Sequence, residues 1–291
     1  MAVNVSLGMN TGAHDGSSTL ESAFDQISGN RRDPGFVVVK SAGNERSFDG
    51  HVRLRAGEGA TGTVTWSTTA EVRTKDYIEV WWSNLDELEF VLVDPRLHRS
   101  PVVSTASPRA EAILGNAVCT MELTALHPDN GASRLVIRLL HQPPAPMDGR
   151  WQLDITGKRI LSRDAWVDAW VERDESRAVR FDNSDNTMTL SIPGTARTVI
   201  TVGACNASPA QVRLTDSSSW GLTRDGRPKP DLCAPGEAVR AACAGTTDGA
   251  IAKTGTSMAA PMVTGTLALV LSRRQIRAGQ TSGMRVSSRP D

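Results

Sequence analysis

Thr254-Gly255-Thr256-Ser257-Met258-Ala259-Ala260-Pro261 is the stretch from which the architecture can be predicted, and it continues as Met262-Val263-Thr264-Gly265-Thr266-Leu267-Ala268-Leu269-Val270. A serine stands among small residues at a turn, and an apolar helical pattern rich in alanine and glycine follows at once. Small neighbours let other backbone approach closely. A helix that begins at this serine directs free N–H groups toward whatever binds there and favours developing negative charge. The alternative is plain helix capping, because serine is a preferred N-cap residue.

A β-α-β unit is predicted near the start of the chain. Val3–Leu7 is a short apolar run, and apolar residues recur at helical spacing from Leu20 to Ile27, with Asp15 as the expected N-cap. Phe36–Val39 is a continuous apolar run, which fits a parallel strand buried on both faces. Strand, helix and strand in this order predict an α/β sheet.

A polar segment, Ser41-Ala42-Gly43-Asn44-Glu45, follows the second of these strands directly. Ligand and catalytic groups in α/β sheets gather at the carboxyl ends of strands. Asn44 alone would equally fit a turn, because asparagine tolerates a left-handed backbone conformation. Together with Ser257, it favours a site at the edge of the sheet.

Several segments, in this order, resemble blocks of the subtilisin-like serine peptidases (S8, subtilases). They are Ser41–Glu45, Leu190–Ala196, Val199–Ala204, Ser217–Gly236 and the stretch around Ser257. A motif is a hypothesis that its context must support, and here the blocks supply context for one another. The resemblance implies a serine endopeptidase that hydrolyses peptide bonds through an acyl-enzyme, with a polypeptide as its substrate.

The resemblance also implies roles for individual residues. Ser257 would be the nucleophile, and its own backbone N–H and the side-chain amide of Asn44 would form the oxyanion hole. The cleft that holds the substrate residue before the scissile bond would be lined by Ser6, Leu7, Gly8, Ala42 and Gly43.

The middle of the chain has a different character. Short alternating runs such as Tyr77–Trp82 and Leu135–Leu140, separated by Gly, Pro, Asn and Asp, predict an inserted β-sandwich or jelly-roll-like module. The predicted organisation is an N-terminally incomplete subtilisin-like α/β domain with a parallel sheet and flanking helices over 1–47 and 183–272, the β-sandwich over 48–182, and a polar tail over 273–291.

Most of the seven tryptophans lie in this middle part. Four of them could stack on a sugar or a peptide, but core packing is the simpler interpretation because aromatic side chains dominate burial in such modules. The four are Trp81, Trp82, Trp166 and Trp170.

A serine nucleophile needs a base and a carboxylate that orients it. The family carries these in an Asp-Thr/Ser-Gly string and a His-Gly-Thr string, both upstream of the Ser-Leu-Gly strand. None of the five histidines is followed by Gly-Thr, and we interpret all five as ordinary: His14, His51, His98, His127 and His141. We therefore expect a fragment of a longer peptidase that is inactive alone.

Two other classes of protein compete with this interpretation. An α/β-hydrolase orders its triad as Ser, acid and His, but no histidine follows Ser257, and Ala259 stands where that motif needs glycine. A non-catalytic pseudo-peptidase, whose β-sandwich binds or regulates a partner, is the remaining alternative.

Composition restricts the other classes. Lys+Arg and Asp+Glu are 32 each, which argues against nucleic-acid binding, and no run approaches the ~20 apolar residues of a membrane span. The first residues lack a signal-peptide pattern, so the chain as written is expected in the cytoplasm, although subtilisin-like peptidases are commonly secreted. No cofactor is predicted; the resemblance allows for calcium, which some family members bind, but no acidic loop identifies its ligands here. The cysteines show no metal-type spacing, and small buried residues are expected at Cys119, Cys205, Cys233 and Cys243.

Overall fold

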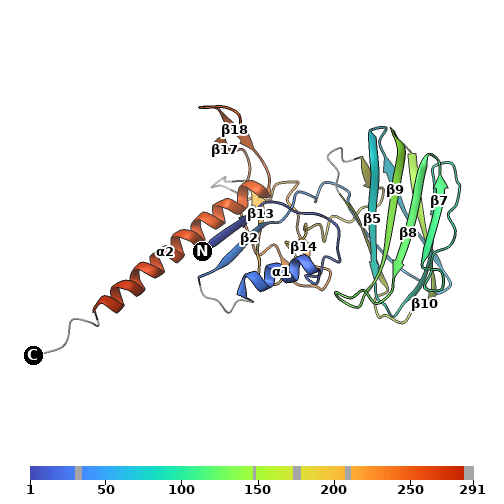
Figure 1. Cartoon of the computed structure of the whole chain (residues 1–291), viewed down its shortest axis with the longest axis horizontal. Coiled ribbons are helices and arrows are strands. Elements are labelled where there is room, and N and C mark those ends of the chain that lie inside the picture. Colours follow the sequence, from blue (N-terminus) through green and yellow to red (C-terminus); the bar gives the residue numbers. More distant parts are fainter. Residues whose placement is uncertain (30–34, 147–148, 173–177, 207–210, 285–291) are drawn as a thin grey trace, which may run out of the picture.

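The computed structural model describes residues 1–29, 35–146, 149–172, 178–206 and 211–284. It has two parts that lie side by side (Figure 1). One is a small parallel sheet with two helices, and the other is a stack of long antiparallel strands. The predicted combination of a parallel α/β sheet with a β-rich middle is confirmed.

The parallel sheet has four strands in the order β1-β2-β13-β16. Their bounds are β1 Ala2–Val5, β2 Val37–Ser41, β13 Ile200–Cys205 and β16 Leu232–Pro235. All three neighbouring pairs are parallel, with Val5 opposite Lys40 and Val202 opposite both Ser41 and Leu232. Segments that are far apart in the sequence therefore end at one edge of the sheet, where the two segments named above, Ser6–Gly8 and Ser41–Glu45, begin.

Helix α1 (Thr19–Ile27) forms where apolar periodicity predicts it, but its N-cap differs from the prediction. Ser18 is the N-cap and makes a capping box with Glu21, because the Asp15 carboxylate is engaged by Ser17 and Asn130. The buried positions on the helix are Glu21 and Asp25, which accept hydrogen bonds from the 195–198 loop. Of the apolar positions, Leu20 and Ile27 are 37% and 60% exposed, whereas Phe24 is half-buried against the small core around Val38.

Helix α2 (Thr256–Met284) packs only its beginning against the sheet. Ala259 and Ala260 are completely buried and share a small core with Val39, Val202 and Ala204. Val263 and Leu267 still pack partly against this core, and the helix then runs away from the body of the molecule (Figure 1), past the predicted start of the tail at residue 273. Neither of the described helices combines the length and apolarity that a membrane crossing requires.

The second part, which we call the two-sheet module, comprises His51–Phe181. Its sheets have the strand orders β12-β4-β10-β6 and β3-β11-β5-β9-β8-β7, and every pairing within them is antiparallel. The strands are β3 His51–Arg55, β4 Thr61–Thr68, β5 Val72–Trp82, β6 Glu87–Val93, β7 Arg109–Leu114, β8 Ala117–Thr124, β9 Ser133–Pro146, β10 Gly149–Arg159, β11 Trp166–Val171 and β12 Val179–Phe181.

One hydrophobic core joins the two sheets of this module. It includes Trp66 and Trp151 from one sheet and Trp82 and Ile137 from the other, all nearly inaccessible to solvent. Alternation of buried and half-buried residues, as along β8, explains why the sequence pattern had period two. The predicted core role holds for Trp81, Trp82 and Trp170, whereas Trp166 is 42% exposed.

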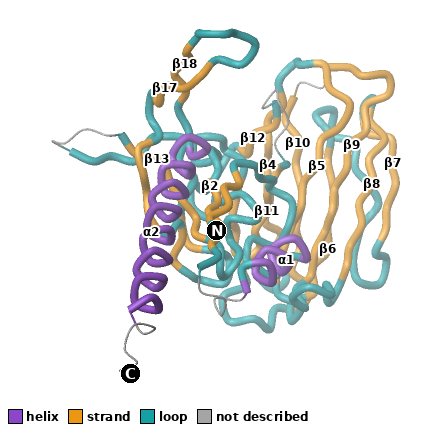
Figure 2. The backbone as a smooth tube through the Cα atoms, turned by 60° about the vertical axis from the view of Figure 1, so that its left-hand side comes forward, coloured by secondary structure: helices purple, strands orange, loops and turns teal. Residues whose placement is uncertain are grey.

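Two short hairpins complete the described structure. The strands β14 (Gly221–Leu222) and β15 (Pro228–Lys229) pair beside the module, and β17 (Val239–Ala242) pairs with β18 (Ala250–Lys253). The β17–β18 hairpin stands out from the molecule near the start of α2 (Figure 2).

A stack of rings joins the two parts. Trp170 of β11 lies between the imidazoles of His14 and His51, with centroid distances of 4.1 and 4.6 Å. His51 also contacts Asp168, and both ring nitrogens of His14 lie 2.9 Å from backbone carbonyl oxygens. Both histidines therefore have structural roles at the junction.

Candidate active site

The start of α2 places Ser257 against the end of β1. The Ser257 hydroxyl donates to the carbonyl oxygen of Ser6 at 3.5 Å, and the Ser6 hydroxyl donates to the carbonyl oxygen of Ser257 at 3.3 Å. Pro261 makes the second bond available, because it lacks the N–H that would otherwise bond the carbonyl four residues earlier. A proline inside the helix therefore links α2 to the substrate-binding segment predicted at Ser6.

The hydrogen bonding of Ser257 differs from that of a capping serine. Helix α2 begins at Thr256, so Ser257 lies within its first turn, and its hydroxyl bonds Ser6 rather than a helix N–H. Among the described residues, none accepts a hydrogen bond from the Ser257 backbone N–H. The geometry leaves this N–H at the positively polarised helix start for a bound group.

Thr256 fixes the oxyanion candidate Asn44 next to Ser257. The backbone N–H of Thr256 donates to Asn44 Oδ1 at 2.9 Å, so the oxygen of the side-chain amide must face the helix. The NH₂ group then points the other way, and it has no hydrogen-bond partner within the described parts of the chain. Asn44 is thus held with its donor side open, as an oxyanion donor requires.

The Thr256 hydroxyl connects the same helix start to β2. It lies 3.1 Å from both the N–H and the carbonyl oxygen of Gly43, and it is completely buried. Sequence patterns assign Thr256 no role, although it stands directly before the proposed nucleophile. Its contacts show that this threonine sets the register between β2 and α2.

Close backbone packing explains the glycines at this junction. The Gly255 N–H donates to the carbonyl oxygen of Gly236 at 2.8 Å. A Cβ on Gly236 would lie 2.7 Å from the Cβ of Ala204 and 2.8 Å from the Gly255 carbonyl oxygen. Only glycine lets β16 pass this close to the helix start.

The predicted cleft residues lie on two adjacent segments at this edge. Ser6, Leu7 and Gly8 extend from β1, with Leu7 81% exposed, while Ala42 and Gly43 follow β2 and are buried. Ala42 is held between its neighbours by its N–H, which donates to Val202, and by its carbonyl oxygen, which accepts from Ser191. The structure brings Ser257, Asn44 and both segments together.

A general base is not part of this arrangement. Within the described parts of the chain, the Ser257 hydroxyl bonds only the Ser6 carbonyl oxygen. His14 is fully buried, and burial lowers its pKa to about 4. The remaining histidines belong to the two-sheet module, where His98 bonds Asp94, His141 bonds Asp76 and His127 packs on Trp81.

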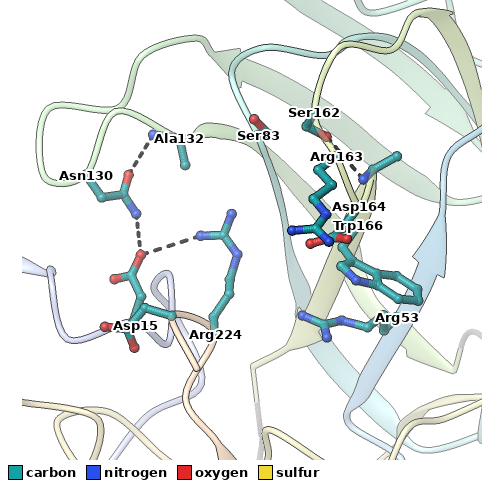
Figure 3. Close-up of a pocket in the computed structure, with 12 residues that line it drawn as sticks. Asp15, Arg53, Ser83, Asn130, Ala132, Ser162, Arg163, Asp164, Trp166 and Arg224 are labelled. Atoms are coloured by element: carbon teal, nitrogen blue, oxygen red, sulfur yellow. Dashed lines mark hydrogen bonds and ion pairs between the residues drawn. The ribbon is translucent and has the colours of Figure 1, made fainter. Parts of the chain in front are cut away.

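A separate cavity of about 370 Å³ lies between the two parts of the molecule. Figure 3 shows Asp15, Asn130 and Arg224 on one side and Arg53 and Trp166 on the other. Asn130 donates to Asp15 at 2.8 Å, and the Arg53 guanidinium lies 5.0 Å from the Trp166 ring centre. The cavity is polar and carries both signs of charge.

Metal-binding clusters and disulfides do not contribute to the described site. No cluster of three His, Cys, Asp or Glu side chains able to hold a metal occurs in the described residues. All four cysteines are free thiols. Cys119 and Cys205 are buried as predicted, but Cys233 is exposed and Cys243 is half-buried, because their strands lie at or beyond the edge of the parallel sheet.

Comparison with known proteins identifies the architecture. Residues 175–285 match the model of the subtilase family, Peptidase_S8. These residues belong to a subtilase-family domain. The match contains Ser257, Thr256 and the blocks from Leu190 onward.

Relatives agree with this assignment. Two C5a peptidases of Streptococcus pyogenes are 40% identical over 65 residues (serotype M18) and 33% identical over 102 residues (serotype M3). These matches cover 22% and 35% of this chain but only 6% and 8% of the relatives. The CspB protease of Clostridium perfringens has a similar structure, with a TM-score of 0.82 and 25% identity, over 95% of this chain and 56% of that one. The chain thus spans little more than half of the structure it resembles.

Proposed function

We propose that this subtilase chain supplies the nucleophile and the oxyanion hole of a serine endopeptidase. The observation that carries the proposal is the way Thr256 orients Asn44 beside Ser257. Acyl transfer needs a nucleophile and donors aimed at the developing oxyanion, and the proposal assigns these roles to Ser257, its backbone N–H and the Asn44 side chain. Family membership supports polypeptides as the substrate class.

The base and its orienting carboxylate, in this proposal, come from polypeptide outside the described site. Two exposed apolar surfaces are suited to contact it. Met262, Leu269 and Val270 are 45%, 75% and 51% exposed on α2, and β1 is an edge strand with one unpaired side. Apolar surface and free strand edges favour association with further chain.

A labelling experiment tests the proposal. The 291-residue chain and the complete product of its natural gene would each be treated with a fluorophosphonate, and the modified residue located by mass spectrometry. We expect Ser257 to be labelled in a gene product heavier than 31.1 kDa and to stay unlabelled in the isolated chain. Strong Ser257-dependent labelling of the isolated chain would contradict the need for an external base.

Two variants make the test specific. Ser257→Ala must abolish labelling. Asn44→Leu should slow it by about 10²–10³-fold, the size of the effect that losing such a donor has in subtilisin. The catalytic proposal would be overturned if the protein made from the natural gene has a mass of 31.1 kDa and no phosphonate labels it.

That last result would favour a second function, a non-catalytic subtilase that binds a partner through the two-sheet module. The polar cavity between the two parts, with Arg53 and Trp166 on its module side, is the observation that favours it (Figure 3). Arg53→Ala would then weaken capture of the partner, whereas Ser257→Ala would leave it unchanged.

A further inference from the structure

A buried lysine lies beneath the proposed substrate cleft. Lys40 stands near the end of β2 and is only 1% exposed. Its ammonium donates to the carbonyl oxygen of Ser41, and it lies 3.2 Å from the hydroxyls of Ser41 and Ser191. All three acceptors are neutral. Among the described residues, no carboxylate forms an ion pair with Lys40.

A second buried lysine provides a comparison within the same molecule. Lys229 is 7% exposed, and its ammonium lies 2.6 Å from the Asp231 carboxylate and 2.6 Å from the Val199 carbonyl oxygen. Burial of a charge is costly unless the charge is paired. Lys229 meets this condition with an acidic residue of its own chain. Lys40 does not, and burial lowers its pKa to about 7, against the opposing effect of the Glu45 charge.

The position of Ser191 connects Lys40 to the cleft. A Cβ on Gly8 would lie 2.6 Å from the Ser191 hydroxyl oxygen, and a Cβ on Gly43 would lie 2.8 Å from it. The hydroxyl therefore lies between the two segments that follow β1 and β2. Ser6, two residues before Gly8, holds the Ser257 hydroxyl. Ser191 thus packs between the two predicted cleft segments, close to the nucleophile, and Lys40 lies directly behind it.

We propose that the cleft between these segments, which we call the slot, selects a substrate with an acidic side chain, glutamate or aspartate, immediately before the scissile bond. The inference rests on the proposed endopeptidase function. The carboxylate would accept a hydrogen bond from the Ser191 hydroxyl, which now donates to the Ala42 carbonyl oxygen over a long 3.3 Å. Lys40 would supply the compensating charge, and hydrogen bonds assisted by charge are the strong ones. Lys40 is in this view a specificity-determining residue.

The test uses peptidyl diphenyl phosphonates that differ only in the side chain next to phosphorus, namely glutamate, glutamine, leucine and lysine analogues. They would react with the complete gene product, and the rate of Ser257 labelling would be measured for each. We expect the glutamate analogue to react at least about tenfold faster than the leucine analogue, the factor that corresponds to about 1.4 kcal/mol. Preference for leucine or lysine would overturn the inference.

Matched variants separate the charge of Lys40 from its packing. Lys40→Met keeps an unbranched side chain of similar length and should remove the preference for glutamate over leucine. Lys229→Met removes a buried lysine elsewhere and should leave the preference unchanged. Ser191→Ala should reduce it. An unchanged preference in both the Lys40 and Ser191 variants, with melting temperatures near that of the wild type, would contradict the inference.

The two proposals fail in different ways. The absolute labelling rate reports on the endopeptidase function, and the ratio between analogues reports on the slot. Where no analogue reacts, titration calorimetry with acetylated tetrapeptides ending in glutamate or leucine measures the slot alone. Tighter binding of the glutamate peptide that Lys40→Met abolishes would support the slot, and equal binding of both peptides would exclude it.

Discussion

The two parts of this molecule bury side chains of different size. The two-sheet module buries large side chains, including Trp66, Trp82 and Trp151, between two sheets that share one core. The parallel-sheet part buries mainly alanine and valine, as at Ala204 and Ala259. Large side chains fill a core and stabilise it, whereas small ones let a helix start approach the strand ends closely enough to assemble a site.

The two parts also differ in how their apolar side chains are buried or exposed. In the module the large core side chains lie between the two sheets, while other apolar side chains, such as Val72 and Ile113, are exposed. In the parallel-sheet part, α2 packs on the sheet with one side of its first turns and leaves Met262, Leu269 and Val270 exposed, and Figure 1 shows the helix extending beyond the sheet. The largest packed core and the candidate site thus lie in different regions of one chain.

The largest expected effect is in the module core. Trp66→Ala should lower the free energy of unfolding by about 3–5 kcal/mol, because it leaves a cavity beside Trp151, whose ring stacks on Trp66. Denaturant titration followed by circular dichroism measures this loss. Trp166→Ala is the exposed control and should cost far less; equal losses would break the contrast between core and surface tryptophans.

The next largest effect is expected at His14, where the two parts meet: the stability of the fold should depend on pH. The pKa of His14 is about 4 in the folded protein, against 6.5 for a solvated histidine side chain such as that of the unfolded chain. Between these two values the unfolded chain therefore binds the extra proton. Stability should fall as pH drops from 6.5 to 4, by up to about 3 kcal/mol. Urea titrations across this range would measure the slope.

Variants identify the origin of this slope. His14→Asn should flatten it, and asparagine suits the left-handed backbone of this position, where φ is 53°. His98→Asn, at a side chain that is 62% exposed, should leave the slope in place. A slope that persists in the His14 variant would assign it to other groups.

A smaller effect is expected where β16 meets α2. Gly236→Ala should cost about 1–3 kcal/mol, because its Cβ would collide with Ala204 and with the Gly255 carbonyl oxygen. Thermal unfolding measures the cost. A lower rate of Ser257 labelling in the complete gene product should accompany it, since the same contact positions the helix start. Wild-type values for both would show that this junction is loosely packed.

The smallest effect has the opposite sign. Gly265 lies in α2 with no atom within 4 Å of an added Cβ, so Gly265→Ala should stabilise the protein by about 0.5–1 kcal/mol. A shift of the melting temperature to higher values would bear this out. Destabilisation would indicate that another surface packs against this side of the helix.

Sequence patterns predicted most of the elements because each pattern reflects a local geometry. The continuous apolar run Phe36–Val39 corresponds to the buried parallel strand β2, and the run Tyr77–Trp82 belongs to the antiparallel strand β5. Helix α1 was also foreseen, but the burial of two acidic residues on it was not. Its buried positions, Glu21 and Asp25, find partners in residues 195–198, which no periodicity can indicate.

Some residues of the candidate site could likewise be named from the sequence, and others could not. Ser257 and Asn44 could be named from the sequence, because the family blocks around them are specific strings of residues. Their roles as catalytic groups stay predictions for the labelling experiment. Thr256 and Ser191 were missed, since a threonine and a serine have no distinctive pattern of their own. Lys40 did leave a signal, a charge at the end of the apolar run of β2, but its meaning depends on what surrounds it.

By itself the sequence determined most helices and strands, the division into α/β and β-rich segments, and the family resemblance. All of these follow from residue types at short spacing. Only the tertiary structure decided which groups meet. It brought Ser6 to Ser257 through a carbonyl that Pro261 leaves free, and it placed Lys40 under Ser191 without a carboxylate in hydrogen-bond contact among the described residues. These contacts join residues up to 251 positions apart, and close packing of strands in space, rather than any local preference, sets such distances.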